Sequence, residues 1–530
     1  KMLNLILLLG FTQAIHMNTT TRMFEDDSGR TIIFHGVNVV VKAPPYIPIT
    51  SSFDPQMSLC AQDIQNLQNW GFNFVRLGVM WQAVETSPGS YNMTYLQQVN
   101  NLVNQLGAAG ISVLLDAHQD LFARKICGEG VPDFYAQNLT DSCGELSPVY
   151  EGFGACIPLS KFNLTYDANG DPLISDCLTH DFPRYYMTPE AADAFQRLYK
   201  NINGLQDKFL AFWNTVSSFF ANNPFIVGYD PFNEPLAADM YTNPDYMVPG
   251  NFDREVLQYL WQKVNVTVRK NDLKKILFFE PVQSDVLPTL GGLIFNVGFN
   301  ETPGGVNFNN AQVLNDHTYC CAVNFNPCVQ NGGDPPLSEA KHCERIHNDR
   351  VKVRSQDAEK LGVGLIFTEF GACSDSDACV AEITSVTNAC DKYLVGWSYW
   401  QFKGYGDYTT AGSTVEGFYD GSGNLETNKL KALQRTYAQA YQGVPTKLFF
   451  IPSTGYFSTS YDLSPNVNAP TVIFLNQAIV YPNGYDISIS NTLNLQPVVT
   501  TKGNFINILY TNPVSSRTTI VITAKSAVEA

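Results

Sequence analysis

Histidine and the Cys-x-x-Cys spacing are what this chain of 530 residues most clearly lacks. It has only 7 histidines, and none of its 12 cysteines lies in a Cys-x-x-Cys pair. Structural zinc sites are built from such closely spaced Cys and His ligands. A zinc site is therefore not expected.

Basic side chains are also in deficit, because 33 Lys and Arg stand against 49 Asp and Glu, which gives a net charge of −16. Nucleic acids and anionic membrane surfaces attract cationic proteins, so neither is an expected electrostatic partner. The acidic balance serves solubility. As the alternative, it fits an acidic compartment such as a gut or a lysosome, in which carboxylates lose charge.

Hydrophobic runs of membrane-spanning length are absent as well. The run over residues 2–11 is too short to span a bilayer. Because small residues follow it at Thr12 and Ala14, it predicts a secretory signal peptide over residues 1–14, cleaved near Ala14. Lys1 precedes the expected initiator Met2 and is interpreted as an artefact.

The chain does have the marks of an exported protein. Its 12 cysteines favour disulfides, although their connectivity cannot be deduced from the sequence. We expect secretion into the extracellular space or a digestive lumen, with the lysosome as the alternative. Glycosylation is expected at the Asn-x-Ser/Thr sequons, which are Asn18, Asn92, Asn138, Asn163, Asn265 and Asn300.

Short apolar runs alternate with helical patterns along most of the chain. Strands that are apolar on both faces are typical of a parallel sheet covered by helices, and eight of them predict a closed (β/α)8 TIM barrel. The runs span residues 31–40, 72–81, 111–120, 226–235, 275–281, 312–320, 364–371 and 394–402. Helices are expected over residues 57–70, 95–109, 189–222, 253–271, 337–361, 377–392 and 428–441.

The length of the chain favours two domains. The barrel is expected over residues 24–443, with an insertion at about 121–188 that carries four cysteines and is interpreted as a disulfide-braced loop over the barrel mouth. Beyond it, prolines separate short alternating runs, which predicts a small antiparallel β-sandwich over residues 444–530. Its expected role is packing against the barrel, with glycan or membrane binding as the alternative.

Polar residues gather at the carboxyl ends of the predicted strands, where barrel enzymes place their catalytic groups. Two of these runs end on a carboxylate, in NEP at residues 233–235 and TEFG at 368–371. A glycosidase needs two carboxylates, one that exchanges a proton and one that attacks the anomeric carbon. Glu234 and Glu369 are therefore the predicted pair, and Asn233 is placed to hold the sugar 2-hydroxyl.

These motifs resemble glycoside hydrolase family 5, and a further ordered set resembles the endoglycoceramidases. Those enzymes release an intact glycan from ceramide and carry a β-sandwich after the barrel. The resemblance covers about residues 30 to 525. Its motifs are HGVNVVVK at residues 35–42, RLGVMW at 76–81, DAHQD at 116–120, NDHTYC at 315–320 and WSYW at 397–400.

The resemblance implies a retaining double displacement in which Glu234 is the acid/base and Glu369 the nucleophile. The two carboxyls are then about 5–5.5 Å apart, and the charge of Glu369 raises the pKa of Glu234. His317 and Tyr319 are expected to hold Glu369 ionised and aimed, and Arg76 to orient it. The expected substrate-binding residues are Lys42, His118, Asp120, Asn233, Tyr319 and Trp400.

Several of these residues have a plainer structural interpretation. Lys42 is otherwise a solvated loop lysine, Trp400 a core residue, and His118 and Asp120 hydrogen-bonding groups of the barrel floor. Glu280, which ends the fifth strand, is interpreted as a structural residue or a support for the site. A lipid groove is expected if the apolar side chains after strands six to eight converge, namely Phe370, Phe402, Tyr405, Tyr408, Phe418 and Tyr419.

The resemblance implies a secreted endo-β-glycosidase that hydrolyses the bond between oligosaccharide and ceramide in glycosphingolipids. The rivals are an endo-β-glucanase, a β-glucosidase acting on glucosylceramide or steryl glucosides, and a glycan- or lipid-binding protein without catalysis. Two carboxylates suffice for the chemistry, so no metal or cofactor is expected. The expected partner is the glycosphingolipid, reached by a monomer through transient contact with a membrane or micelle, and nucleic acid is not a partner.

Overall fold

The computed structural model describes residues 14–152, 154–283, 293–320, 335–409 and 416–526. The predicted signal peptide therefore lies, apart from Ala14, outside the described residues. Eight parallel strands close into a barrel in the order β10-β11-β12-β13-β4-β5-β8-β9, which confirms the predicted fold. They are β4 (His35–Val39), β5 (Phe74–Gly78), β8 (Ser112–Asp116), β9 (Ile226–Asp230), β10 (Ile276–Phe279), β11 (Gln312–Thr318), β12 (Gly364–Phe370) and β13 (Gly396–Tyr399).

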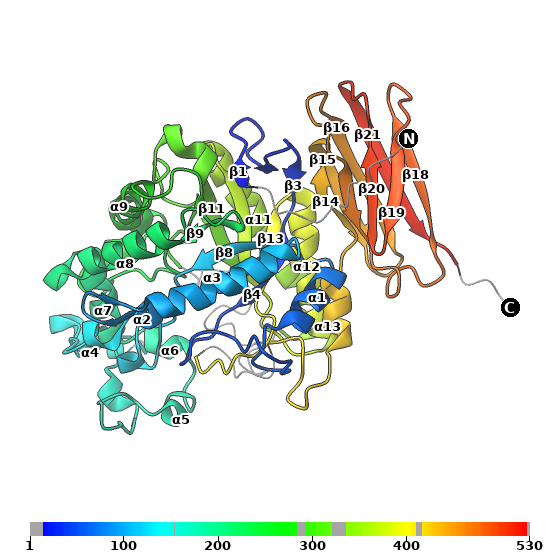
Figure 1. The fold of residues 1–530 in the computed structure, drawn as a ribbon. Coiled ribbons are helices and arrows are strands. Elements are labelled where there is room, and N and C mark those ends of the chain that lie inside the picture. The colour runs from blue at the N-terminus through cyan, green and yellow to red at the C-terminus, as the bar shows by residue number, and fades with distance from the viewer. Residues whose placement is uncertain (1–13, 153, 284–292, 321–334, 410–415, 527–530) are drawn as a thin grey trace.

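Helices cover the outside of the barrel (Figure 1). Their ends follow local chemistry, since the side chains of Asn92 and Ser376 accept backbone N–H groups at the starts of α3 and α12, and α11 stops at Gly362, whose φ is 73°. The main helices are α1 (Ala61–Asn69), α3 (Met93–Ala108), α7 (Pro189–Tyr199), α8 (Leu205–Phe220), α9 (Gln258–Arg269), α11 (Ala340–Leu361), α12 (Asp377–Tyr393) and α13 (Thr427–Leu433). Short elements lie between them, namely α2 (Trp81–Val84), β6 (Glu85–Ser87), β7 (Ser90–Tyr91), α4 (Ser147–Gly152), α5 (Ile174–Cys177) and α6 (Pro183–Tyr186).

Two predicted helices differ from the structure. The helix expected over residues 189–222 is divided into α7 and α8, because Asn201, Asn203 and Gly204 have φ angles of 54°, 55° and 75°. Asn and Gly tolerate this left-handed region best. The helix expected over residues 428–441 is wrong in its second half, since α13 ends at Leu433 and residues 437–441 form a strand.

The first described strands, β1 to β3, belong to a sheet of the C-terminal domain. This sheet has the order β1-β2-β3-β14-β17-β20-β19, so the predicted strand over residues 31–40 is divided between two sheets. Its strands are β1 (Ile15–Met17), β2 (Phe24–Asp26), β3 (Thr31–Ile32), β14 (Tyr437–Tyr441), β17 (Thr471–Phe474), β19 (Val498–Lys502) and β20 (Phe505–Leu509). A second antiparallel sheet shares its core and contains β15 (Gly443–Ile451), β16 (Tyr456–Leu463), β21 (Ser516–Ala524) and β18 (Tyr485–Asn491).

The C-terminal domain packs directly on the barrel, beside α12 (Figure 1). The ring of His35 lies between those of Trp397 and Tyr437, with centroid distances of 4.2 and 3.6 Å. Burial lowers the pKa of His35, so this stack is neutral. The hydroxyl of Tyr437 donates to the carbonyl of Gly71 at 2.8 Å. Packing against the barrel is therefore observed, while glycan or membrane binding by this domain stays a hypothesis.

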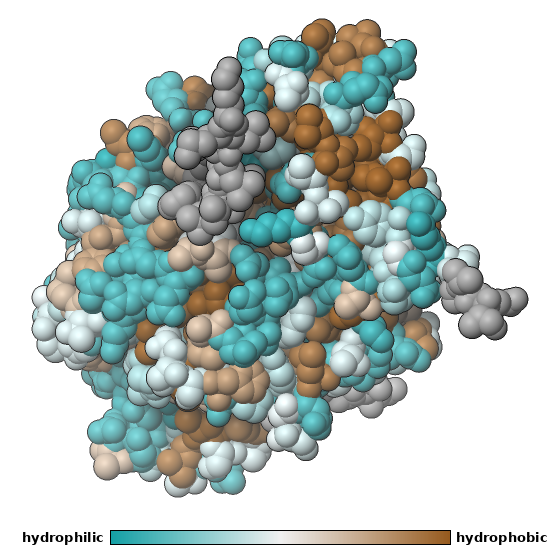
Figure 2. Space-filling view, turned by 45° about the vertical axis from the view of Figure 1, so that its right-hand side comes forward, coloured by the Kyte–Doolittle hydropathy of each residue, from teal (hydrophilic) through white to brown (hydrophobic). Residues whose placement is uncertain are grey.

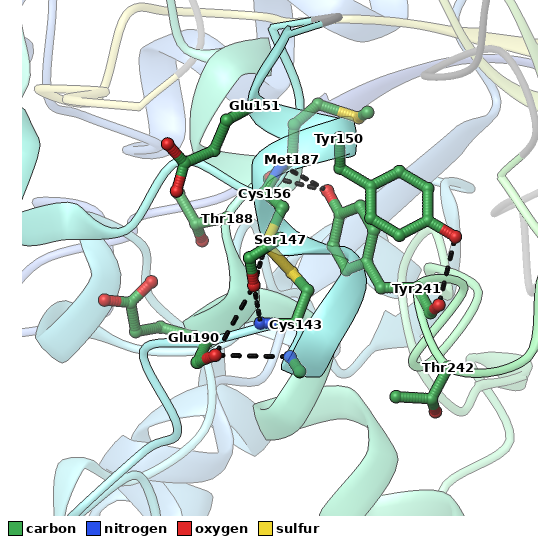
Figure 3. The surroundings of a disulfide bond; sticks show 12 residues. Cys143, Ser147, Tyr150, Glu151, Cys156, Met187, Thr188, Glu190, Tyr241 and Thr242 are labelled. Atoms are coloured by element: carbon green, nitrogen blue, oxygen red, sulfur yellow. Dashed lines mark hydrogen bonds between the residues drawn. A yellow bond between two sulfur atoms is a disulfide. The ribbon is translucent and has the colours of Figure 1, made fainter.

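The insertion between β8 and β9 is braced as the sequence predicts. Its four cysteines form the disulfides Cys127–Cys177 and Cys143–Cys156. Figure 3 shows that the second disulfide lies beside Tyr241, whose hydroxyl donates to the carbonyl of Met187 at 2.5 Å. Because Tyr241 follows the NEP motif in the loop after β9, the insertion is tied to the loop that carries Glu234.

The outer surface is mostly hydrophilic in the view of Figure 2, with hydrophobic residues gathered in a patch at its upper right. Among the described residues, no helix is both long and apolar enough to cross a bilayer. One predicted glycosylation site conflicts with the fold, since Asn265 is buried in α9 and its side-chain oxygen accepts from Arg269 Nε at 3.1 Å.

Candidate active site

The two predicted catalytic carboxylates meet at the carboxyl end of the barrel. Glu234 lies just beyond the end of β9, and Glu369 lies near the end of β12. One oxygen of each, together with a ring nitrogen of His317, forms a group whose atoms are all within 4.8 Å of one another. Retaining glycosidases hold their carboxyls about 5–5.5 Å apart, whereas inverting enzymes leave about 6.5–9.5 Å for a water. The observed spacing fits retention.

Both oxygens of Glu369 are held by neighbouring side chains. Arg76 of β5 donates from Nη1 to Oε1 of Glu369 at 2.5 Å, and the hydroxyl of Tyr319 donates to Oε2 at 3.1 Å. Burial raises the pKa of Glu369, while the Arg76 guanidinium acts in the opposite direction. The carboxylate is thereby fixed in one orientation, as a nucleophile requires.

Arg76 is fully buried at the centre of an acidic cluster at the barrel floor. Besides Glu369, its guanidinium lies within 3.5 Å of carboxylate oxygens of Asp116, Asp230 and Glu280. One cation cannot neutralise four buried carboxylates, and burial accordingly raises the pKa of Asp230 to about 7. We call this set, Arg76 with Asp116, Asp230, Glu280 and Glu369, the Arg76 cluster.

Glu234 has the accessibility and the pKa of a general acid. Its side chain is 16% exposed, and its Oε1 accepts from Gln283 Nε2 at 2.7 Å. Burial, followed by the charge of Asp120, raises the pKa of Glu234 to about 7. The predicted cause, the charge of Glu369, is thus not the leading one. A carboxyl with this pKa is protonated in a large fraction of molecules near neutral pH.

His317 lies between the two carboxylates rather than on Glu369 alone. Its Nδ1 is 2.7 Å from Oε1 of Glu234 and 3.6 Å from Oε2 of Glu369, and its Nε2 is 3.1 Å from the hydroxyl of Thr368. Burial lowers the pKa of His317 to about 4, so the imidazole is neutral. The expected contact with Glu369 is the longer one, and the direct hydrogen bond supports Glu234.

Lys42 is enclosed by carboxylates at the rim of the barrel. Its side chain is 0% exposed, and its Nζ lies 2.5 Å from Asp120, 2.7 Å from Asp407 and 3.6 Å from Glu129. The alternative of a solvated loop lysine is therefore wrong. These carboxylates hold the pKa of Lys42 well above its usual range despite its burial. We call this set, Lys42 with Asp120, Glu129 and Asp407, the Lys42 cluster.

His118 and Trp400 pack together above the Lys42 cluster. Their rings stack with centroids 4.9 Å apart, and Lys42 Nζ lies 5.0 Å from the centroid of the Trp400 ring. His118 binds Asp116 at 2.9 Å through Nδ1 and Asp120 at 3.3 Å through Nε2. These two acids outweigh burial and raise the pKa of His118 to about 10.

Asp116 joins the two clusters, because it contacts both Arg76 and His118. All ten residues predicted from the sequence are therefore linked at one end of the barrel. Asn233 belongs to this network, since its Oδ1 accepts from Arg76 at 2.8 Å and its Nδ2 donates to the carbonyl of Gln119 at 3.1 Å. Sugar contacts by Lys42, His118, Asp120, Asn233, Tyr319 and Trp400 stay predictions.

Three sets of described residues bring possible metal ligands within 4.8 Å of one another. Cys320, Cys343 and Glu382 form one, but the two cysteines are joined in a disulfide. The second is His118 with Asp120 and Glu129. Its two acids belong to the Lys42 cluster, in which the lysine ammonium already supplies the cation. The third is Glu234 with His317 and Glu369. Each set thus has a structural or catalytic use of its own.

The expected lipid groove after strands six to eight is wrong. All six side chains proposed for it are buried, and Phe418 packs against both Tyr399 and Phe402, with centroid distances of 5.7 and 5.5 Å. These six side chains are therefore core residues and do not form an open surface.

Sequence reasoning missed the supports that come from loops. Glu129 lies in the braced insertion, Asp407 and Glu416 follow β13, and Gln283 follows β10. Glu416 accepts from the Trp400 indole N–H at 2.9 Å. A carboxylate in a loop has no periodic pattern around it. Only Cys127, which lies two residues before Glu129 and braces the insertion, could have drawn attention to that residue.

Two protein-family models match most of this chain. The family model "Cellulase (glycosyl hydrolase family 5)" matches residues 47–145 and 180–406, and the "Glycoside hydrolase family 5 C-terminal domain" matches residues 435–523. An endoglycoceramidase of Cyanea nozakii is 31% identical over 477 residues, which cover 90% of this chain and 87% of that protein. One of Hydra vulgaris is 30% identical over 485 residues, which cover 91% and 84%.

Among solved structures, endo-glycoceramidase II from Rhodococcus sp. in its ganglioside GM3 complex has the same fold. It superimposes with a TM-score of 0.69 at 19% identity and covers 95% of this chain and 99% of its own. The carboxylate pair, with Glu234 after β9 and Glu369 on β12, and the closed barrel agree with the matched family models. This chain belongs to glycoside hydrolase family 5.

Proposed function

We propose that this protein is an endo-β-glycosidase that hydrolyses the bond between oligosaccharide and ceramide in glycosphingolipids. The observation that carries the mechanism is the Glu234–Glu369 pair, whose spacing fits retention. The substrate class is supported by the similarity to endoglycoceramidases, which spans 90% of the chain.

The reaction begins when Glu369 attacks the anomeric carbon while Glu234 gives its proton to the glycosidic oxygen, so that ceramide leaves as an alcohol. Arg76 and Tyr319 hold the attacking carboxylate in line. Glu234, now ionised, takes a proton from water, and the hydroxide attacks the glycosyl ester and frees Glu369. The neutral His317 and Gln283 keep Glu234 oriented in both steps.

The leaving group must lie on the side of Glu234, because that residue protonates it. The segment after β10 carries Gln283 on this side, and Asp253 ties its two ends down by accepting the N–H groups of Val282 and Gly298 at 2.7 and 2.9 Å. Gln283 therefore lies beside the position that the leaving group must take.

We also propose that the protein works outside the cytosol, either secreted or in a lysosome. Four disulfides among the described residues support an oxidising compartment, namely Cys127–Cys177, Cys143–Cys156, Cys320–Cys343 and Cys373–Cys379. A monomer that contacts micelles or membranes only through its lipid substrate fits a site contained within one chain.

The test is mass spectrometry of the products formed from a purified ganglioside, with carboxymethyl cellulose as the competing substrate. We expect free ceramide and the intact oligosaccharide, and no reducing sugar from the cellulose. The matched control is Glu369→Gln, which must give neither product. A released monosaccharide would instead identify an exo-β-glucosidase, and turnover of the cellulose alone an endo-β-glucanase.

A further inference from the structure

Glu280 is a buried acid whose contacts the mechanism above does not use. It follows β10 directly and lies beneath the acid/base. Its Oε2 accepts the backbone N–H of Glu234 at 3.0 Å. Glu234 has a φ of 41°, a left-handed conformation that a glutamate rarely adopts. This hydrogen bond therefore supports the backbone of Glu234 in an unfavourable conformation.

The same short segment also holds the Glu234 side chain. Gln283 donates from Nε2 to the carboxyl of Glu234 at 2.7 Å, and its backbone N–H donates to the carbonyl of Pro235 at 2.9 Å. Residues 280–283 thus bind Glu234 at two points: Glu280 accepts its backbone N–H, and Gln283 donates to its carboxyl. We call residues 280–283 the β10 clamp.

The surroundings of Glu280 indicate that it is a neutral acid. In the Arg76 cluster one guanidinium faces four carboxylates, and the nearby His317 is uncharged. Burial, the charge of Asp230 and the charge of Glu234 hold the pKa of Glu280 well above its usual range. Asn315 Nδ2 donates to Oε1 of Glu280 at 3.3 Å.

We propose that Glu280 is a positioning residue that aims Glu234 at the glycosidic oxygen. This inference rests on the proposed role of Glu234 as acid/base. Loss of the Glu280 contact misplaces the proton donor and leaves the nucleophile Glu369 in place, because Arg76 and Tyr319 hold that residue independently.

A misplaced acid matters only when the leaving group needs a proton. Phenyl β-lactoside expels a basic phenolate and depends on Glu234, whereas 2,4-dinitrophenyl β-lactoside expels a stable anion and does not. The burst of dinitrophenolate in the first turnover reports attack by Glu369 alone. Neither substrate contains a lipid, so the test does not depend on whether ceramide is the natural leaving group.

The experiment compares Glu280→Leu, Glu280→Gln and a control variant on both lactosides. We expect Glu280→Leu to lower kcat for the phenyl substrate on the order of 100-fold with little change in KM, and the dinitrophenyl burst rate less than about 5-fold. Glu280→Gln, which keeps the shape and the acceptor oxygen, recovers most of this loss. The control variant, Glu190→Leu, removes a buried acid that accepts the N–H of Leu159 in the insertion at 3.0 Å, and it changes both substrates by the same factor.

Should Glu280→Leu fail to fold, Gln283→Leu at a half-buried position tests the same clamp. It should show the same substrate selectivity and move the alkaline limb of the pH profile upward, because the Gln283 hydrogen bond lowers the pKa of Glu234. Equal losses on both lactosides, or a Glu280→Gln variant as damaged as Glu280→Leu, would overturn the proposal. If Glu234→Gln lowers both lactosides by the same factor, the acid/base assignment itself is overturned, and the role of Glu280 with it.

Discussion

Two buried cations stand at the same end of this barrel, and their surroundings differ in a way that explains the site. Arg76 at the floor faces Asp116, Asp230, Glu280 and Glu369, all of which come from barrel strands or the residue after one. Lys42 at the rim faces Asp120, Glu129 and Asp407, which come from loops.

Each cluster contains more acidic than basic side chains, and in each the pKa of at least one acid is raised. In the Arg76 cluster the pKa values of Asp230 and Glu280 are raised by burial and by their acidic neighbours. In the Lys42 cluster Lys42 lowers the pKa values of Asp120 and Asp407 in spite of burial, while that of Glu129 is raised. Asp230 and Glu280 of the Arg76 cluster therefore bind a proton more readily than ordinary carboxyls. Asp120 and Asp407 of the Lys42 cluster favour the ionised form, which suits hydrogen bonding to sugar hydroxyls.

The largest effect should come from the carboxylates that react. Glu369→Gln and Glu234→Gln each remove a group whose ionisation the reaction uses and preserve its shape, so natural-substrate turnover should fall roughly 10⁴-fold or more. Turnover is measured as ceramide released, with circular dichroism as the control for folding. Near-normal turnover in either folded variant would refute the assignment.

The next effect concerns the rim cation. Lys42→Met removes the buried ammonium that pairs with Asp120 and Asp407, so we expect the free energy of unfolding to fall by about 3–5 kcal/mol. Urea unfolding followed by tryptophan fluorescence measures this loss. In the double variant Lys42→Met, Asp120→Asn, part of the loss should be recovered, because one of the unpaired charges is gone. A single variant as stable as the wild type would show that the lysine is not the charge partner.

The raised pKa values of Glu234 and Glu369 predict the shape of the pH profile. Glu234 acts while protonated and its pKa is raised to about 7, so kcat/KM should fall about tenfold per pH unit above that value. Glu369 acts while ionised, and burial raises its pKa above that of an ordinary glutamate, so the acidic limb should lie above the usual range as well. A profile that stays flat to pH 9 would contradict the role of Glu234.

The smallest effect separates the neutral from the ionised acids of the rim. Glu129→Gln replaces a carboxyl whose pKa burial raises well above its usual range, and it should change the free energy of unfolding by less than about 1 kcal/mol. Asp120→Asn removes a charge paired with Lys42 at 2.5 Å and should cost about 2–3 kcal/mol. Urea midpoints of the two variants make this comparison, and equal costs would mean that Glu129 is ionised.

The barrel could be predicted because each strand has a local pattern of continuous apolar residues that ends on polar ones, and the structure confirms all eight. Strand identity was harder where the pattern was short. Residues 437–441 continue a helical pattern in sequence, but pairing with β3 and β17 makes them a strand. The same pairing draws residues 31–32 out of the predicted first barrel strand, because hydrogen bonds to a distant sheet override local preference.

The sequence by itself determined the barrel, the cysteine-braced insertion and the two carboxylates that react. Those features depend on neighbouring residues or on the ends of regular strands. Only the tertiary structure decided how these groups are charged and held. The pKa of Glu234 depends on burial and on Asp120, the backbone of Glu234 on Glu280, and the charge of Lys42 on three loop acids. Electrostatic energy falls with distance in space and not along the chain, so residues far apart in sequence set the chemistry of the site.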